Sequence, residues 1–237
     1  MRAAERWLRE LREAESLRRR MDERTGSLTR QFDRTCDVLE ELGYLVPEEV
    51  PPDVPEDGVP PEESPVVTDA GRRLGRIWSE TDLLTAECLR SGVFRGLTPA
   101  ELAGCVSALV FEARRESPGQ PAVPAGKVAT AIAEMRRVRA RLADVEVEHQ
   151  VPMTRDLDLG FVWAAFRWAD GQTLDRVLAG AEQAGTELSG GDFVRWARQL
   201  IDLLDQLAKV ADDPLAGTAR AAVGRVRRGV VSVAVSG

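Results

Sequence analysis

The chain has 237 residues, of which 43% are hydrophobic, so it can bury a core and has room for one large or two small domains. A net charge of −7 excludes a global positive field that attracts nucleic acid, and an aromatic content of 5% argues against an aromatic-rich surface for stacking bases. No apolar run approaches the ~20 residues that a membrane span requires, and the charged N-terminus is unlike a signal peptide.

Three cysteines, Cys36, Cys88 and Cys105, are far apart in the sequence, and none belongs to a CxxC pair. An odd number without that spacing argues against a disulfide framework or a zinc site. We therefore expect all three to be small core residues of a reduced, cytoplasmic protein.

Residues 1–25 are dense in arginine and glutamate around a narrow apolar stripe, which predicts a solvated or coiled-coil-like helix. The arginines slightly outnumber the acids, so a nucleic-acid-binding arm is an alternative, although the acids are interleaved with them. Ser27 can cap a second helix, from Leu28 to Leu42, that Gly43 would end. The buried face of this second helix is expected to carry Phe32, Cys36, Leu39 and Leu42.

An acidic, proline-rich segment follows at residues 46–65, with seven of the 13 prolines and seven acidic residues but no basic residue. It can neither propagate a helix nor pack, so we expect a mobile loop. Val66–Thr68 then predicts a short strand that leads into a helix. The helix, the segment Leu42–Leu45, the loop and the strand with its following helix have the order of recognition helix, strand, wing and strand in the second half of a winged-helix fold. A free-standing helix with a β-turn cap is the alternative.

The remainder of the chain predicts an all-α bundle. Thr98, Pro99 and Glu101 form a capping box with proline at the first helical position, which marks the start of a helix. A long helix is expected from Lys127 to Glu148, with an apolar side that carries Val128, Ile132, Met135, Val138 and Leu142.

Further helices are expected over residues 161–168, 174–184, 192–211 and 215–233. We thus predict an all-α core with at least five helices from Thr81 to Val233. The last of these helices should turn five residues inward, namely Ala219, Ala222, Val223, Val226 and Val230.

The sequence contains no recognisable catalytic constellation. The segment from Gly119 to Val128 has six residues between its glycines and valine after Lys127, whereas a P-loop needs four residues and then Ser or Thr. The single histidine, His149, falls at a predicted helix end, where a cation complements the helix dipole. Arg155 with the nearby carboxylates Asp156 and Asp158 has the composition of a stabilised turn.

The helix from Asp192 to Ala211 is strongly amphipathic, with its apolar residues within one arc. The apolar arc carries Phe193, Trp196, Ala197, Leu200, Leu203, Leu204 and Leu207. The opposite arc carries Arg195, Arg198, Asp202, Asp205 and Lys209, with Gln199 and Gln206 on its flank. From the residues alone, this polar arc is an ordinary solvated face.

Five segments carry a family resemblance. They read SETDLLTAECLRSGVF, LTPAELAGCVSALVFEAR, EHQVPMTRDLDLGFVWAAFRWADGQTLDRVL, GDFVRWARQLIDLLDQLA and AAVGRVRRGVVSVAVSG. Their order and approximate spacing resemble those of the C-terminal helical (DSHCT) domain of exosome-linked DExH RNA helicases of the Ski/Mtr group, in particular the actinobacterial HelY-type members. The resemblance extends from roughly Ser27 to Gly237.

The resemblance implies that the chain is a C-terminal piece of a longer ATP-dependent RNA helicase of RNA processing or decay, without ATPase motifs of its own. ATP and Mg²⁺ would bind in upstream RecA-like domains. Residues 1–25 would be the remnant of a coiled-coil arch, residues 26–76 the second half of a winged-helix segment, and residues 77–237 the DSHCT domain. The implied partners are single-stranded RNA, the RecA-like lobes and RNA-degradation machinery, with no membrane.

The segment GDFVRWARQLIDLLDQL resembles the ratchet helix that lines the RNA channel of these helicases. This implies RNA contacts at Arg195, Gln199 and Asp202, with Arg198 beside them. Gln199 stands where relatives often have a basic residue, so we expect it to bond a base edge or a sugar hydroxyl rather than a phosphate. Asp202 would accept hydrogen bonds from an amino group or a 2′-hydroxyl. The resemblance further implies docking of Arg225, Arg227 and Arg228 on the RecA-like lobes, for which a helix-dipole role is the alternative.

A stand-alone helical protein-interaction module is the alternative function, in which the arginine-rich first helix and the acidic loop bind a protein partner. Genomic context separates the two hypotheses. An open reading frame that continues upstream through a GKT/S loop and a DExH box supports the helicase, whereas an independent promoter before Met1 supports the interaction module.

Overall fold

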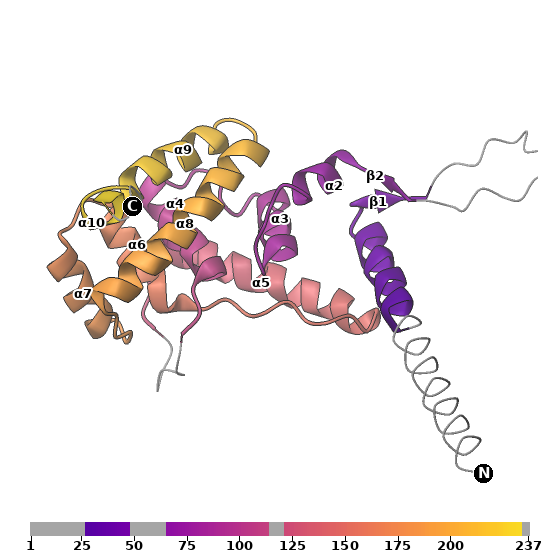
Figure 1. Ribbon diagram of the computed structural model, residues 1–237, viewed down its shortest axis with the longest axis horizontal. Helices are drawn as coiled ribbons and strands as arrows, with labels where there is room; N and C mark the ends of the chain where they lie inside the picture. The colour runs from indigo at the N-terminus through magenta and orange to yellow at the C-terminus, as the bar shows by residue number, and fades with distance from the viewer. Residues whose placement is uncertain (1–26, 48–64, 114–120, 234–237) are drawn as a thin grey trace, which may run out of the picture. The chain divides into compact units, whose positions relative to one another are not determined.

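The computed structural model describes residues 27–47, 65–113 and 121–233 (Figure 1). The predictions for residues 1–25 and for nearly all of the acidic loop lie outside these residues. The chain divides into two compact units, one formed by residues 1–68 with 145–152 and the other by residues 69–144 with 153–237. The winged-helix assignment and the domain boundaries at residues 25 and 76 stay predictions.

The smaller unit contains a helix over residues 27–41 and two short strands, β1 (Leu45–Val46) and β2 (Val66–Val67). The strands pair antiparallel, with Leu45 opposite Val67 (Figure 1). Gly43 ends the helix with φ of +73°, a conformation that glycine adopts without a Cβ penalty. This two-stranded sheet confirms the prediction of a short β element.

The predicted buried face of this helix is wrong in part. Phe32 is 68% exposed, and Cys36 and Leu39 are only half-buried. At the C-terminal end of the helix Glu41 bonds His149, and just after it the Oγ1 of Thr68 donates to the carbonyls of Gly43 and Tyr44. Leu42 is half-buried as well, and the residues of this unit that are buried instead are Val38 and Tyr44.

The larger unit is helical, as predicted. Its helices are α2 (Asp69–Leu74), α3 (Asp82–Arg90), α4 (Pro99–Val110), α5 (Lys127–Glu148, whose last turn belongs to the smaller unit), η1 (Leu159–Phe161), α6 (Val162–Ala169), α7 (Leu174–Gln183), α8 (Gly190–Val210), α9 (Leu215–Val226) and α10 (Val230–Val233). The described residues of the predicted core contain no strand, so its all-α class is confirmed. No helix in the described ranges is both long and apolar enough to cross a membrane.

Helix α4 is the centre of this unit, packed against α6, α8 and α9 (Figure 1). Nine of its 12 residues are buried, which is the pattern of a helix surrounded by others. The predicted capping box is confirmed: the Glu101 carboxylate accepts from the Thr98 backbone N–H at 2.8 Å, and Thr98 Oγ1 accepts from the Glu101 N–H at 3.3 Å. Gly104 permits the close approach of α6, because a Cβ there would lie 3.1 Å from the Cβ of Phe166.

Helix α5 has the predicted bounds and the predicted apolar side. Each of the five predicted residues is at most 3% exposed. Arg139, on the same helix, is 8% exposed and binds the connector before η1 through the carbonyls of Thr154 and Arg155.

An aromatic cluster joins α4, η1, α6 and α8. The Phe111 ring, directly after α4, lies 5.0 Å from the Trp196 ring and 5.8 Å from the Phe161 ring, between ring centroids. Phe193 lies edge-on to Phe161 at 5.6 Å and to Trp168 at 5.2 Å. Such pairs contribute about 0.5–1.5 kcal/mol each beyond their buried area, so the cluster fixes the rotation of α8.

The predicted last helix is interrupted. The chain turns at Gly229, with φ of +50°, between α9 and the short α10. The Trp168 indole N–H donates to the Val226 carbonyl at 2.8 Å, and its ring lies close to Gly229. A contact from α6 therefore ends α9, and Val230, predicted to point inward, is 42% exposed.

We predict that Trp196→Ala lowers the free energy of unfolding by ~3–5 kcal/mol, because the side chain is 7% exposed and its loss leaves a cavity in the aromatic cluster. Trp78→Ala is the matched control. It removes the same atoms from a side chain that is 82% exposed, so the change should be within ~0.5 kcal/mol. Urea unfolding measures both, and equal stability of the two variants would contradict the packing described.

The cysteines differ in accessibility. Cys88 and Cys105 are 0% exposed, and burial raises the pKa of each thiol to about 12, so neither forms appreciable thiolate near neutral pH. Cys36 is half-buried rather than a core residue, and burial raises its pKa too.

We predict that iodoacetamide at pH 8 modifies Cys36 in the native protein and the other two only after denaturation. Peptide mass mapping reads the result, and rapid native labelling of Cys88 or Cys105 would refute it.

Candidate nucleic-acid interface

Helix α8 has an apolar face that is fully packed and a polar face that is open. Ser189 caps its start, with Oγ accepting from the Asp192 N–H at 3.0 Å. The seven residues of the predicted apolar arc are all at most 7% exposed. Ile201 and Val210 are buried as well, which widens the apolar face beyond the prediction.

The four residues predicted to contact RNA, Arg195, Arg198, Gln199 and Asp202, are all exposed on α8. The Arg195 guanidinium lies over the Trp196 ring, 4.4 Å from its centroid, and Nη2 is 3.6 Å from Asp192 Oδ1. The Arg198 side chain makes no hydrogen bond or ion pair with any other described residue. Arg198 can therefore turn its guanidinium to an external anion. The RNA contacts themselves stay a prediction.

A cavity of about 350 Å³ lies against this polar face, between α8, the end of α4 and residues 78–80. Gln199 and Asp202 line it from α8, so it contains two of the four predicted residues. Sequence reasoning missed the others that face it, among them Trp78, Glu112 and Arg155. They come from three separate segments without helical periodicity, so only the fold brings them together.

The loop before α3 presents Trp78 at the edge of this cavity. The side chain is 82% exposed, while the backbone N–H donates to Gln206 Oε1 on α8 at 2.6 Å. The next turn is bonded as well: the Thr81 N–H donates to Ser79 Oγ, and Thr81 Oγ1 donates to the Leu109 carbonyl at 2.9 Å. Hydrogen bonds therefore hold the backbone around Trp78, while the indole side chain is exposed to solvent.

The residues of the Arg155 turn are structural, as expected. Arg155 Nη1 donates to the Phe111 carbonyl at 2.9 Å. The Asp158 carboxylate accepts from the N–H groups of Gly160 and Ala113, at 2.9 and 2.7 Å. These bonds tie the connector to the end of α4, and Asp156 Oδ1 lies 3.2 Å from Arg139 Nε on α5.

His149 directly follows α5, and its Nε2 lies 2.6 Å from Glu41 Oε2 within the smaller unit. This agrees with a structural role at a helix end. Across the described ranges, no group of three or more His, Cys, Asp or Glu side chains is placed to hold a metal ion.

The three arginines predicted to dock on RecA-like lobes all have partners within the larger unit. Arg225 Nη1 donates to the Ala169 carbonyl at 3.4 Å, and Arg227 Nη2 lies 3.3 Å from Asp205 Oδ2. Arg228 stacks on Trp168, 3.6 Å from the ring centroid, and donates to its carbonyl. Arg228 therefore ties the residues after α9 to Trp168 of α6. Docking of the three arginines on RecA-like lobes stays a prediction.

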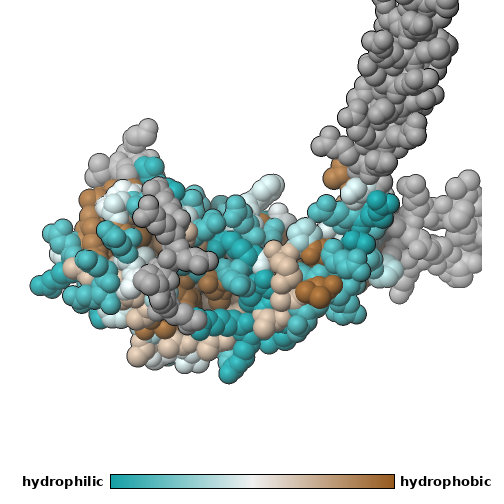
Figure 2. Space-filling model, turned by 90° about the horizontal axis from the view of Figure 1, so that it is seen from below, coloured by the Kyte–Doolittle hydropathy of each residue, from teal (hydrophilic) through white to brown (hydrophobic). Residues whose placement is uncertain are grey.

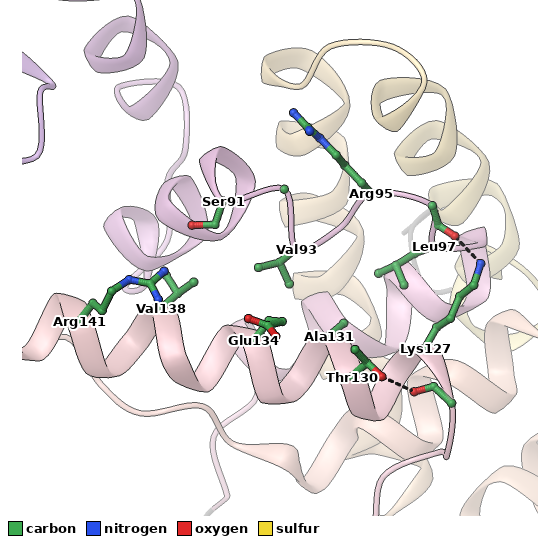
Figure 3. Close-up of a pocket in the computed structure, with 13 residues that line it drawn as sticks. Ser91, Val93, Arg95, Leu97, Lys127, Thr130, Ala131, Glu134, Val138 and Arg141 are labelled. Atoms are coloured by element: carbon green, nitrogen blue, oxygen red, sulfur yellow. Dashed lines mark hydrogen bonds between the residues drawn. The ribbon is translucent and has the colours of Figure 1, made fainter.

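A second cavity, of about 710 Å³, lies between α5 and the loop from α3 to α4 (Figure 3). The charged side chains in its lining do not point to a common position. Lys127 Nζ donates to the Gly96 carbonyl at 2.7 Å, Glu134 pairs with Arg137, and Arg95 extends away from α5. The face of α8 is therefore the better candidate for binding.

Comparison with known proteins gives the family. Residues 64–234 match the DSHCT (NUC185) domain. The chain is 43% identical over 240 residues to "Probable helicase HelY" of Mycobacterium tuberculosis H37Rv, which covers 98% of this chain and 25% of that protein. It is 43% identical over 237 residues to the Mycobacterium leprae protein of the same name, covering 97% and 24%.

A more distant relative is "DExH-box ATP-dependent RNA helicase DExH15 chloroplastic" of Arabidopsis thaliana, 29% identical over 150 residues, or 61% of this chain and 12% of that protein. The chain thus spans about a quarter of the length of its mycobacterial relatives. The domain match covers most of the chain, so the chain belongs to the DSHCT (NUC185) domain family.

Proposed function

We propose that the chain is the RNA-guiding C-terminal domain of an ATP-dependent DExH RNA helicase of RNA processing or decay, and that it is not catalytic by itself. The observation that carries the proposal is the polar face of α8, whose side chains are exposed beside a cavity while its apolar face is buried. The relatives are named as helicases, and these names support the enzyme class proposed for the longer protein.

The polar face has the dimensions and chemistry for a short stretch of single-stranded RNA. From Arg195 to Asp202 it rises ~10 Å at ~1.5 Å per residue, about the length of three stacked nucleotides. Arg198 can contact a phosphate, whereas Gln199 and Asp202 can bond base edges and 2′-hydroxyls.

The mixture of positive and negative charges on this face suits weak contacts that let RNA move rather than tight binding. Asp202 repels phosphate, and Asp192 compensates part of the Arg195 charge. Contacts of this kind are individually weak, so RNA can move along the helix while ATP-driven domains supply the force. ATP and Mg²⁺ would bind in the RecA-like lobes outside this chain, and cytoplasmic RNA-degradation machinery would receive the strand.

A protein-interaction module is the second candidate, and the helix over residues 27–41 favours it. Leu28 and Phe32, one turn apart on that helix, are 67% and 68% exposed. On the face shown in Figure 2, hydrophobic residues lie in small areas separated by hydrophilic ones. An open reading frame without upstream RecA-like domains would support this candidate.

We predict that the isolated chain hydrolyses no ATP and binds RNA with a dissociation constant of ~10⁻⁴ to 10⁻⁶ M that rises steeply with salt. We expect weak, salt-dependent RNA binding because the chain has a net charge of −7 and only a local basic face. Saturable ATP turnover by pure protein would refute the first part, and nanomolar binding at physiological salt the second.

We predict that the double substitution Arg195→Ala/Arg198→Ala weakens RNA binding but changes the free energy of unfolding by no more than ~0.5 kcal/mol, because both side chains are exposed. The slope of log K against log salt should fall by about 0.7 for the phosphate contact of Arg198, and by up to about 1.4 if Arg195 contacts a second phosphate of the single strand. In the full-length helicase the same pair should slow unwinding.

Arg141→Ala/Arg176→Ala is the matched control, since it removes the same charge from exposed positions on α5 and α7. Fluorescence anisotropy over a salt series compares the two doubles. If they change affinity and slope equally, the effect is one of net charge and the α8 interface is wrong.

A further inference from the structure

Trp78 is the most exposed large hydrophobic side chain in the described ranges, at 82%. Single exposed apolar residues are common and by themselves need no explanation. Trp78 differs because its loop is held rigidly. Its backbone N–H is bonded to α8 through Gln206, and the preceding Ile77 is 4% exposed. The backbone that carries the indole is thus held close to the polar face of α8.

The cavity beside Trp78 is rich in hydrogen-bond acceptors. Asp202, Glu80 and Glu112 contribute carboxylates to its lining, and Gln199 adds an amide. The one cation in the lining, Arg155, donates to the carbonyls of Phe111 and Leu109. This charge balance disfavours a phosphate and favours a flat group whose edge carries N–H donors.

We propose that Trp78 is a stacking platform for one nucleobase of single-stranded RNA, whose hydrogen-bonding edge points to Gln199 and Asp202. The inference rests on the proposed function and adds a binding subsite to it. An indole face stacks on any base, and adjacent acceptors orient the base edge. A low aromatic content excludes a broad stacking surface, but one exposed ring is enough for one base.

The test compares wild type with Trp78→Ala and Trp78→Phe, by anisotropy of a labelled oligoribonucleotide at low salt, where binding is tightest. Loss of one stacking contact should raise the dissociation constant of Trp78→Ala by about 5- to 100-fold. Trp78→Phe keeps an aromatic face and should recover most of the affinity. Phe32→Ala, an exposed aromatic residue of the smaller unit, is the matched control and should bind like wild type.

A second probe separates stacking from other effects. It is the same oligomer with every base replaced by hydrogen, so that only the ribose–phosphate backbone remains. Wild type and Trp78→Ala should bind this abasic strand equally. Thermal melting of each variant establishes that it is folded.

Three results would overturn the inference: equal affinity of wild type and Trp78→Ala for normal RNA, an equal loss on the abasic strand, or an equal loss with Phe32→Ala. In each of these cases wild type still binds RNA and the proposed function stands. No RNA binding by wild type would overturn the proposed function itself.

Discussion

Burial of the apolar face of α8 against α4 is the constraint on which the rest of the larger unit depends. Because α4 is surrounded on nearly all sides, α8 must present a continuous apolar arc to it. Rotation of α8 by one residue, ~100°, would bury Arg198 or Asp202 without a partner, at a cost of several kcal/mol. The core packing therefore determines which side chains of α8 face outward.

This constraint also allows a strongly acidic chain to carry the RNA-facing surface that we propose. The affinity for RNA that we propose would not come from the net charge of −7 but from a few outward groups on one helix. Trp78 and Gln206 link that helix to the loop before α3, and Arg155 links the end of α4 to the connector before η1. The surface is thus assembled from segments distant in sequence, each held by backbone hydrogen bonds.

The parts of the fold that depend on local chemistry were predictable from the sequence. The capping box at Thr98, the apolar side of α5 and the two arcs of α8 follow from hydrogen bonds and periodicity within single helices. Tertiary contacts explain the failures. Trp168, distant in sequence, ends α9, and the described neighbours of Phe32 leave it uncovered. The cavity beside α8 could not be foreseen, because Trp78, Glu112 and Arg155 share no pattern.

Photocrosslinking of 4-thiouridine RNA to the full-length protein tests the central claim, that the outer face of α8 is the RNA-contacting surface. Mass spectrometry of the crosslinked peptides locates each contact. We expect crosslinks within residues 195–202, from the helix face that carries Arg198 and Asp202. Crosslinks within this chain that are confined to α5, α7 or the helix over residues 27–41 would contradict it.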